Sequence, residues 1–174
     1  TLRSGKIEEA LSGRKHGAGV RILLGTRSVY AYTNDTSEAG LLRAAEQAAA
    51  ALGEIGEGQD VTLHPVAIPN IHPVVIAPSG LELRKKVSML KEACSAAKEY
   101  DALIAQVIGN LIEREKEVLI ANSEGLYAQD TRTYVRMAVS AVASNGAENQ
   151  IGTQSPGALQ GFEFFHGLDL AALG

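Results

Sequence analysis

The feature that most constrains the fold is a run of alternating side chains at Thr133–Ala143. Apolar residues occupy every second position from Val135 onward, and mostly polar or small residues fill the positions between them. Such alternation is typical of a β-strand that packs one face on a core. An Asn-Gly dipeptide follows at 145–146 and favours a tight turn. We therefore predict a hairpin that joins Tyr134–Ser144 to Glu148–Thr153.

Several other segments have strand character. Ala18–Leu24 and Ser28–Thr33 alternate on either side of a short glycine-containing loop, which predicts a hairpin near the N-terminus. Further strands and turns are predicted at these positions: strands at Leu103–Ile108, Lys116–Ala121 and Gly161–Phe165, and turns at Asn110 and Asn122–Gly125. Because successive strands are joined by short loops, antiparallel pairing is favoured.

Helical spacing and capping residues predict two main helices. The first follows the turn at Asn34–Ser37 and ends at Gly53. The second begins with a capping box formed by Ser79 and Glu82, and it ends near Tyr100. Each has an apolar stripe at helical intervals. The stripes are Leu41, Ala45, Ala48 and Leu52 in the first helix, and Leu83, Val87, Leu90, Cys94 and Ala97 in the second.

The segment Gly53–Pro78 connects the two helices and holds four of the five prolines. Proline disfavours helix interiors and central strands, so we predict an extended connection with one short strand at Val61–Leu63. A helical turn is predicted at Leu168–Leu173. A chain of 174 residues suits one domain. We predict a single α+β domain over 1–174, with a mostly antiparallel sheet and two main helices.

Composition argues against some classes of function. The formal net charge is −4 and no long basic run occurs, which argues against direct nucleic-acid contact because neutralising phosphates supplies much of that affinity. No apolar run reaches the roughly 20 residues that span a bilayer. The single cysteine cannot form an internal disulfide, which favours a reducing compartment. We predict a cytoplasmic protein without a signal peptide, and we expect the chain to be truncated at both ends.

The candidate metal ligands are spaced unlike a zinc motif. A helical zinc site needs two ligands about one turn apart. The histidines are His16, His64, His72 and His166. Two of them lie eight residues apart in the proline-rich connection, and Glu163 lies three residues before the last one in a strand-like stretch. We therefore predict no catalytic, metal-binding or cofactor-binding residue in this chain.

A few reactive or charged residues admit a structural and a functional interpretation. Cys94 lies on an apolar helical stripe, which favours a small buried hydrophobe over a nucleophile with an accessible site and a paired histidine. Asp130 and Arg132 share one side of a predicted strand. They form either a local ion pair or a contact with a chamber or another domain. The same alternatives hold for Arg21 and Arg136.

Three segments, taken in order, resemble the TldD/PmbA family. They are HGAGVRILLGTRSVYAYTND at His16–Asp35, the lysine-rich helix that leads to DALIAQV at Leu83–Val107, and the stretch Leu119–Phe165 with ANSEG, DTR and GFEFF. Together they cover nearly the whole chain. The GFEFF ending is more similar to the TldD branch. The chain departs from that branch at 158–160, where TldD-like chains tend to carry an arginine.

The resemblance implies a zinc-dependent peptidase that acts on peptides or partly unfolded polypeptides. In that family an HExxxH helix, in a second domain further along, binds zinc and activates a water; this chain contains no such motif. The resemblance thus implies a non-catalytic N-terminal domain that shapes a chamber and contacts an identical or a PmbA/TldE-type subunit. Two alternatives stay open: a stand-alone interaction module without enzymatic activity, and a nucleic-acid-binding accessory domain. An exposed sheet edge would suit peptide binding by strand addition.

Overall fold

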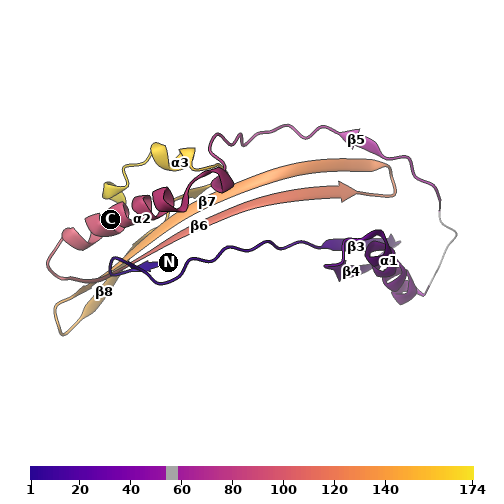
Figure 1. The fold of residues 1–174 in the computed structure, drawn as a ribbon. Helices are drawn as coiled ribbons and strands as arrows, with labels where there is room; N and C mark the ends of the chain where they lie inside the picture. The colour runs from indigo at the N-terminus through magenta and orange to yellow at the C-terminus, as the bar shows by residue number, and fades with distance from the viewer. Residues whose placement is uncertain (54–58) are drawn as a thin grey trace. The chain divides into compact units, whose positions relative to one another are not determined.

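The structure is a computed structural model that describes residues 1–53 and 59–174. Helices and a largely antiparallel sheet confirm the predicted α+β class (Figure 1). The chain divides into two compact units, one of Thr1–Ala10 with Val61–Gly174 and one of Leu11–Asp60. This is a finer division than the single domain predicted over 1–174. Part of the predicted connection, residues 54–58, lies outside the described residues.

The smaller unit is a hairpin with one helix. Strands β3 (Ala18–Leu24) and β4 (Arg27–Thr33) pair antiparallel along their full length, which confirms the predicted hairpin. Helix α1 (Glu38–Leu52) begins where the Ser37 hydroxyl accepts a hydrogen bond from the amide of Gly40, at 3.2 Å. It ends at Gly53, whose φ of 75° is the left-handed conformation that glycine adopts readily.

The buried stripe of α1 differs from the predicted one. Its buried residues are Gly40, Ala44, Ala48 and Leu52, whereas Leu41 is 37% exposed. A side chain at residue 40 would overlap the backbone oxygen of Asp35, so only glycine allows this close approach. Ala48 and Leu52 are buried as predicted, and in the first half of the helix the buried positions lie one residue earlier than predicted.

The larger unit is built on two long strands, β6 (Ile104–Ala121) and β7 (Leu126–Ser144), which pair antiparallel. The prediction of two separate strands with a turn at Asn110 was wrong. Asn110 lies within the ladder opposite Ala138, and its side-chain oxygen accepts a hydrogen bond from the Thr1 hydroxyl at 2.9 Å. The charged residues that follow Asn110 alternate between the two faces of one strand.

Shorter strands extend this sheet. Strand β1 (Leu2–Arg3) pairs with β6 and with β2 (Lys6–Ile7), and β8 (Asn149–Gln154) and β9 (Gly157–Ala158) pair with β7. The pairing of β8 confirms the hairpin predicted at 145–146. Strand β5 (His64–Val66) pairs parallel to β7, so the short strand lies at 64–66 and not at 61–63 as predicted. Its Pro65 is compatible with an edge strand.

Helical elements cover one face of the sheet (Figure 1). They are the turn η1 (Pro78–Gly80), helix α2 (Leu83–Glu99), the short α3 (Glu163–His166) and the turn η2 (Ala171–Leu173). The core joins one side of α2 to the alternating face of β7 and to two phenylalanines after β9. Its members include Leu90, Ala93, Cys94, Ala97, Val135, Met137, Val139, Phe162 and Phe165. The predicted faces of β7 are thereby confirmed.

The start of α2 differs from the predicted capping box. Residue Glu82 is the N-cap without a side-chain hydrogen bond, and Ser79 lies in the preceding turn. The Ser79 hydroxyl instead donates to Oε1 of Glu115 at 3.2 Å. Leu83 is 63% exposed, so the buried stripe begins later than predicted. The turn η1 places Ser79 next to β6. Its hydroxyl therefore bonds to the Glu115 carboxylate and not to a backbone amide in the first turn of α2.

The predicted strand at Gly161–Phe165 is wrong, because these residues form a helical turn. Phe162 and Phe165 are both buried, and their ring centroids lie 5.6 Å apart. A spacing of three residues places two side chains on one face of a helical turn, whereas it would place them on opposite faces of a strand. The helical turn predicted at Leu168–Leu173 is confined to η2. No described helix is long and apolar enough to cross a bilayer.

Candidate functional site

The free half of the β6–β7 hairpin carries opposite charges on its two faces. We call residues 111–121 of β6 and 126–136 of β7 the ribbon. The carboxylate of Glu113 lies 2.6 Å from the ammonium of Lys86 on α2, and Glu115 accepts from Ser79. These contacts place the glutamates at 113, 115 and 117 on the face that α2 covers, since alternate residues share a face.

The other face of the ribbon is basic. It carries Arg114 and Lys116 of β6, both exposed, at the positions between the glutamates. The strand register brings Arg132 opposite Lys116 and Arg136 opposite Ile112. Asp130 is the one acidic side chain among these positions of the ribbon, and its carboxylate lies 2.6 Å from Nε of Arg132. The basic face therefore keeps a net positive charge although the whole chain has a formal charge of −4.

The arginines named from the sequence have local partners. The Asp130–Arg132 ion pair confirms the structural interpretation, and the functional one stays a prediction. Arg21 donates to the hydroxyl of Ser28 across the β3–β4 hairpin at 3.1 Å. In the other unit, Nε of Arg136 donates to the hydroxyl of Ser155 at 2.6 Å. Each contact joins neighbouring positions of one sheet.

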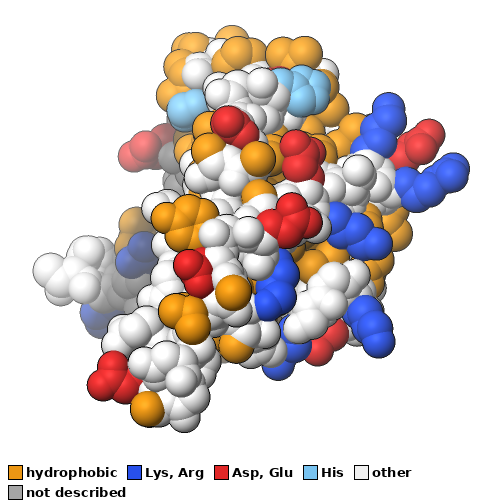
Figure 2. Space-filling view, turned by 90° about the vertical axis from the view of Figure 1, so that its left-hand side faces the viewer, with side chains coloured by type: hydrophobic (Ala, Val, Ile, Leu, Met, Phe, Trp, Pro, Cys, Tyr) orange, Lys and Arg blue, Asp and Glu red, His pale blue; other side chains and the backbone are white. Residues whose placement is uncertain are grey.

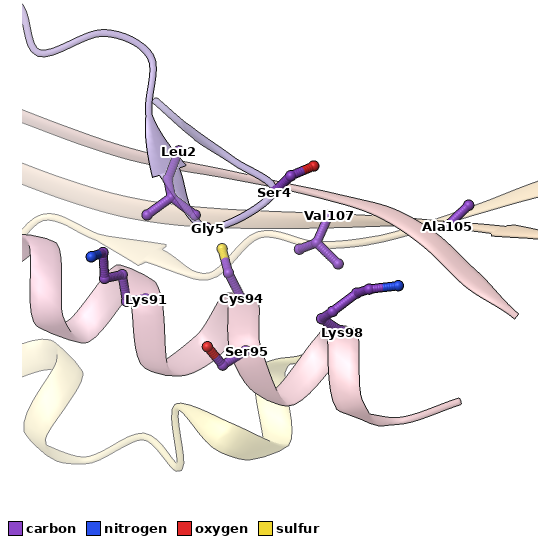
Figure 3. A pocket seen from close by; sticks show the side chains of 9 residues that line it. All are labelled: Leu2, Ser4, Gly5, Lys91, Cys94, Ser95, Lys98, Ala105 and Val107. Atoms are coloured by element: carbon purple, nitrogen blue, oxygen red, sulfur yellow. The ribbon is translucent and has the colours of Figure 1, made fainter. Parts of the chain in front are cut away.

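A cavity of about 430 Å³ lies between the N-terminal hairpin, α2 and the start of β6 (Figure 3). Leu2, Ser4 and Gly5 line it from the hairpin, and Lys91, Cys94 and Lys98 line it from α2. Its remaining lining residues are Ser95, Ala105 and Val107. No histidine or carboxylate is among them. The ammonium of Lys98 donates to the backbone oxygen of Ile104, so this lysine ties α2 to β6.

Cys94 has the properties of a core residue. It is 4% exposed, and burial raises the pKa of its thiol. A thiol with a raised pKa and no neighbouring base is a poor nucleophile. Its sulfur packs against Gly109 of β6, at a place where any side chain would overlap it. The cavity of Figure 3 is thus lined by serine, lysine and a buried thiol, without a histidine or a carboxylate.

The histidines belong to four different segments of the chain. His16 precedes β3, His64 begins β5, His72 lies in the connection and His166 ends α3; all are exposed. Glu163 does not approach His166 as a ligand pair, because its carboxylate accepts from the amides of Ile76 at 2.8 Å and Gly161 at 2.9 Å. Within residues 1–53 and 59–174, no group of three or more His, Cys, Asp and Glu could hold a metal ion.

A second cavity of about 580 Å³ lies between α2 and the C-terminal segment. Apolar side chains make up about half of its lining, with Glu92, His166 and Asp169 among the polar ones.

On the face shown in Figure 2, acidic, basic and hydrophobic side chains are interspersed.

Comparison with known proteins identifies the family. Residues 1–52 match the model of the PmbA/TldA metallopeptidase domain 1, and residues 76–174 match that of the PmbA/TldA metallopeptidase central domain. The chain belongs to the TldD/PmbA family. The boundary between the two family domains falls within the connection between α1 and η1, near the division into two compact units.

Curated relatives extend well beyond this chain. A metalloprotease of Methanothermobacter thermautotrophicus is 27% identical over 99% of this chain and 37% of its own length. A metalloprotease TldD homolog of Haemophilus influenzae is 27% identical over 94% of this chain and 34% of its own length. The TldD/PmbA chain described here therefore spans about a third of the length of these relatives.

Solved structures share the fold. A protein from Bacteroides thetaiotaomicron that bears the description modulator of DNA gyrase gives a TM-score of 0.72 at 13% identity, over 91% of this chain and 38% of its own. A protein of the same description from Thermotoga maritima gives a TM-score of 0.61 at 16% identity, over 89% of this chain and 34% of its own. At these identities the likeness establishes the TldD/PmbA fold of the chain.

Sequence reasoning did not predict the two charged faces of the ribbon. The signal was present as the alternation Glu-Arg-Glu-Lys-Glu at 113–117. This alternation lies partly between the turn predicted at Asn110 and the strand predicted at Lys116–Ala121, and partly within that strand. Its side chains were therefore not assigned to faces. The strand register supplies that assignment for this TldD/PmbA chain.

Proposed function

We propose that this chain is a non-catalytic part of a TldD/PmbA zinc metallopeptidase that processes peptides. The match to domain 1 and to the central domain of a metallopeptidase carries the proposal. The curated metalloproteases are about three times as long, which leaves room for a catalytic domain outside the residues matched here. In this proposal the chain shapes the substrate chamber and the subunit contacts.

The proposal assigns zinc to the rest of the protein. The described residues contain no group of three or more possible metal ligands, and the carboxylate of Glu163 accepts hydrogen bonds from two backbone amides. A catalytic zinc needs about three protein ligands and an open position. The described residues do not fit that requirement, so no catalytic step is assigned to them.

The proposed partner is a second subunit, either identical or of the PmbA/TldE type, and the proposed compartment is the cytoplasm. Exposed apolar residues suit subunit contacts in both units. In the smaller unit these are Leu23, Tyr30 and Tyr32, and in the larger one Ile112, Ile120 and Ile151. Exposed aromatic and aliphatic side chains are common at protein interfaces.

Zinc content and peptide hydrolysis test the proposal. We would purify the full-length protein that contains this chain and, separately, residues 1–174. We expect bound zinc and chelator-sensitive hydrolysis of an unfolded polypeptide such as casein in the full-length protein, and neither in residues 1–174. Hydrolysis by residues 1–174 alone would contradict the non-catalytic assignment. A full-length protein without zinc or activity would favour the stand-alone interaction module.

A further inference from the structure

Strand β6 has an open edge along the ribbon. One edge pairs with β7 throughout. On the other edge, β1 pairs only with Ile108 and Gly109. From residue 111 to residue 121, no strand of the described chain pairs with this outer edge. The backbone amides and carbonyls of an open edge are free to pair with an added strand.

The side chains of this edge alternate in charge and in partners. Glu113 and Glu115 already have partners in Lys86 and Ser79. By contrast, Arg114 and Lys116 have no ion pair and no side-chain hydrogen bond among the residues that the structure describes. Arg132 and Arg136 continue the same basic face on β7. Glu117, on the opposite face, also has no ion pair and no side-chain hydrogen bond among the described residues. The unpaired charges at the edge are therefore two cations on one face and one carboxylate on the other.

We propose that the open edge of β6 binds an extended peptide that carries acidic side chains at every second position. In a strand added to this edge, alternate side chains project to the two faces of the sheet. Those on the basic face lie beside Arg114 and Lys116, where opposite charges in neighbouring strands stabilise pairing. Those on the other face lie beside Glu113, Glu115 and Glu117, where acidic residues are disfavoured.

The same alternation excludes other strands. Charged side chains along an edge generally prevent indiscriminate pairing. A uniformly acidic peptide would place half of its charges against the glutamates, and an apolar peptide would desolvate the two cations. Only an alternating pattern satisfies both faces, so the edge selects by the period of charge and not by net charge.

A polypeptide fits this edge better than a nucleic acid. A phosphate backbone that followed the edge would present negative charge to both faces, including the glutamates. Two exposed isoleucines, Ile112 and Ile120, border the cations on the basic face and suit apolar side chains of a peptide. The inference deepens the proposed function, on which it rests for the choice of a peptide as ligand.

Two octapeptides of equal composition test the proposal. One alternates Glu and Thr, and the other repeats the block Glu-Glu-Thr-Thr, so both have the same net charge. We would titrate each fluorescently labelled peptide with residues 1–174 and measure anisotropy. We expect the alternating peptide to bind about fivefold more tightly, from a few cross-strand pairs. Backbone amide NMR shifts are expected at residues 111–121. Equal affinity of the two peptides, or shifts elsewhere only, would overturn the proposal.

Matched variants assign the binding to the basic face. In Arg114→Gln with Lys116→Gln we expect the preference for the alternating peptide to disappear. The control is Glu117→Gln, an exposed change on the other face of the same strand, which is expected to leave the affinity for the alternating peptide unchanged and to lessen the repulsion of the block peptide. A wild-type preference in the double variant would overturn the proposal. If the wild type shows no preference between the peptides, but binds duplex DNA or self-associates and the double variant does neither, the proposal would also be overturned. Because binding requires no hydrolysis, this result is independent of the test of the proposed function.

Discussion

At the scale of single residues, the carboxylate of Glu163 joins two segments that are distant in sequence. It accepts from the amides of Ile76 and Gly161, and so holds the start of α3 against the segment that leads to η1. Phe162 and Phe165, in the same short segment, are almost fully buried. The GFEFF motif is therefore explained by packing and by a hydrogen-bonded turn.

We predict that Glu163→Gln lowers the free energy of unfolding by about 1 kcal/mol, because a neutral amide replaces a charged acceptor. Burial raises the pKa of Glu163, but the backbone amides, Ile76 first among them, outweigh it and lower the pKa below the usual 4.5. A lowered pKa stabilises the fold above the unfolded-state pKa and loses that effect as the pH falls through the lowered value. Urea unfolding at neutral and acidic pH should show the difference between the two proteins narrowing below about pH 4.5. A difference that is constant with pH would contradict this role.

Gly109 and Cys94 form a second residue-scale contact. A Cβ at residue 109 would overlap the sulfur of Cys94 and approach Cδ1 of Leu90 to 2.9 Å. We predict that Gly109→Ala destabilises the larger unit by about 1–3 kcal/mol, as overpacking does in other cores. Adding Cys94→Ala removes the overlapping sulfur, so the double variant should lose less than the sum of the single changes. Additive losses in denaturant unfolding would argue against direct contact.

At the scale of elements, Lys86 links α2 to the ribbon. Its side chain is 12% exposed, its ammonium lies 2.6 Å from Glu113, and it lies 5.3 Å from the centroid of the Phe162 ring. The Asp130–Arg132 pair has the same distance, but Arg132 is 59% exposed. Partial burial strengthens the Lys86–Glu113 ion pair, and the Phe162 ring adds a cation–π contact. An exposed ion pair such as Asp130–Arg132 contributes little to stability.

We predict that Lys86→Gln costs about 1–2 kcal/mol of unfolding free energy, from the lost charge-assisted hydrogen bond and ring contact. Arg132→Gln is the matched control and should cost less than about 1 kcal/mol. Thermal and urea unfolding of both variants gives the comparison. Similar losses of unfolding free energy in the two variants would show that the partly buried Lys86 contributes no more to stability than the exposed Arg132.

Local patterns were predictable at this scale, whereas contacts between distant segments were not. The β3–β4 hairpin, α1, most of α2 and the alternating face of β7 followed from periodicity and turn residues. The continuity of β6 did not, because its charged middle resembles a loop until β7 and α2 supply partners. The turn at Phe162–Phe165 and the role of Ser79 also depend on residues far away in the chain, at 76 and 115. The basic face needed the strand register.

At the scale of the whole molecule, the chain contains two family domains and about a third of the length of its relatives. The larger unit consists of a packed base, where helices cover the sheet, and a ribbon whose β6 edge is open among the described strands (Figure 1). The base explains stability, and the ribbon offers backbone and charge to a partner. The proposed substrate-contacting role requires such a surface.

The most direct measurement is the steady-state kinetics of the full-length protein on a peptide that contains alternating acidic residues. We predict that Arg114→Gln with Lys116→Gln raises KM about fivefold and leaves kcat nearly unchanged, because the lost contacts bind substrate and transition state equally. The Glu117→Gln protein should match the wild type. A loss of kcat with unchanged KM would place these residues in the chemistry itself, and wild-type kinetics in all variants would contradict a role of the ribbon in substrate binding.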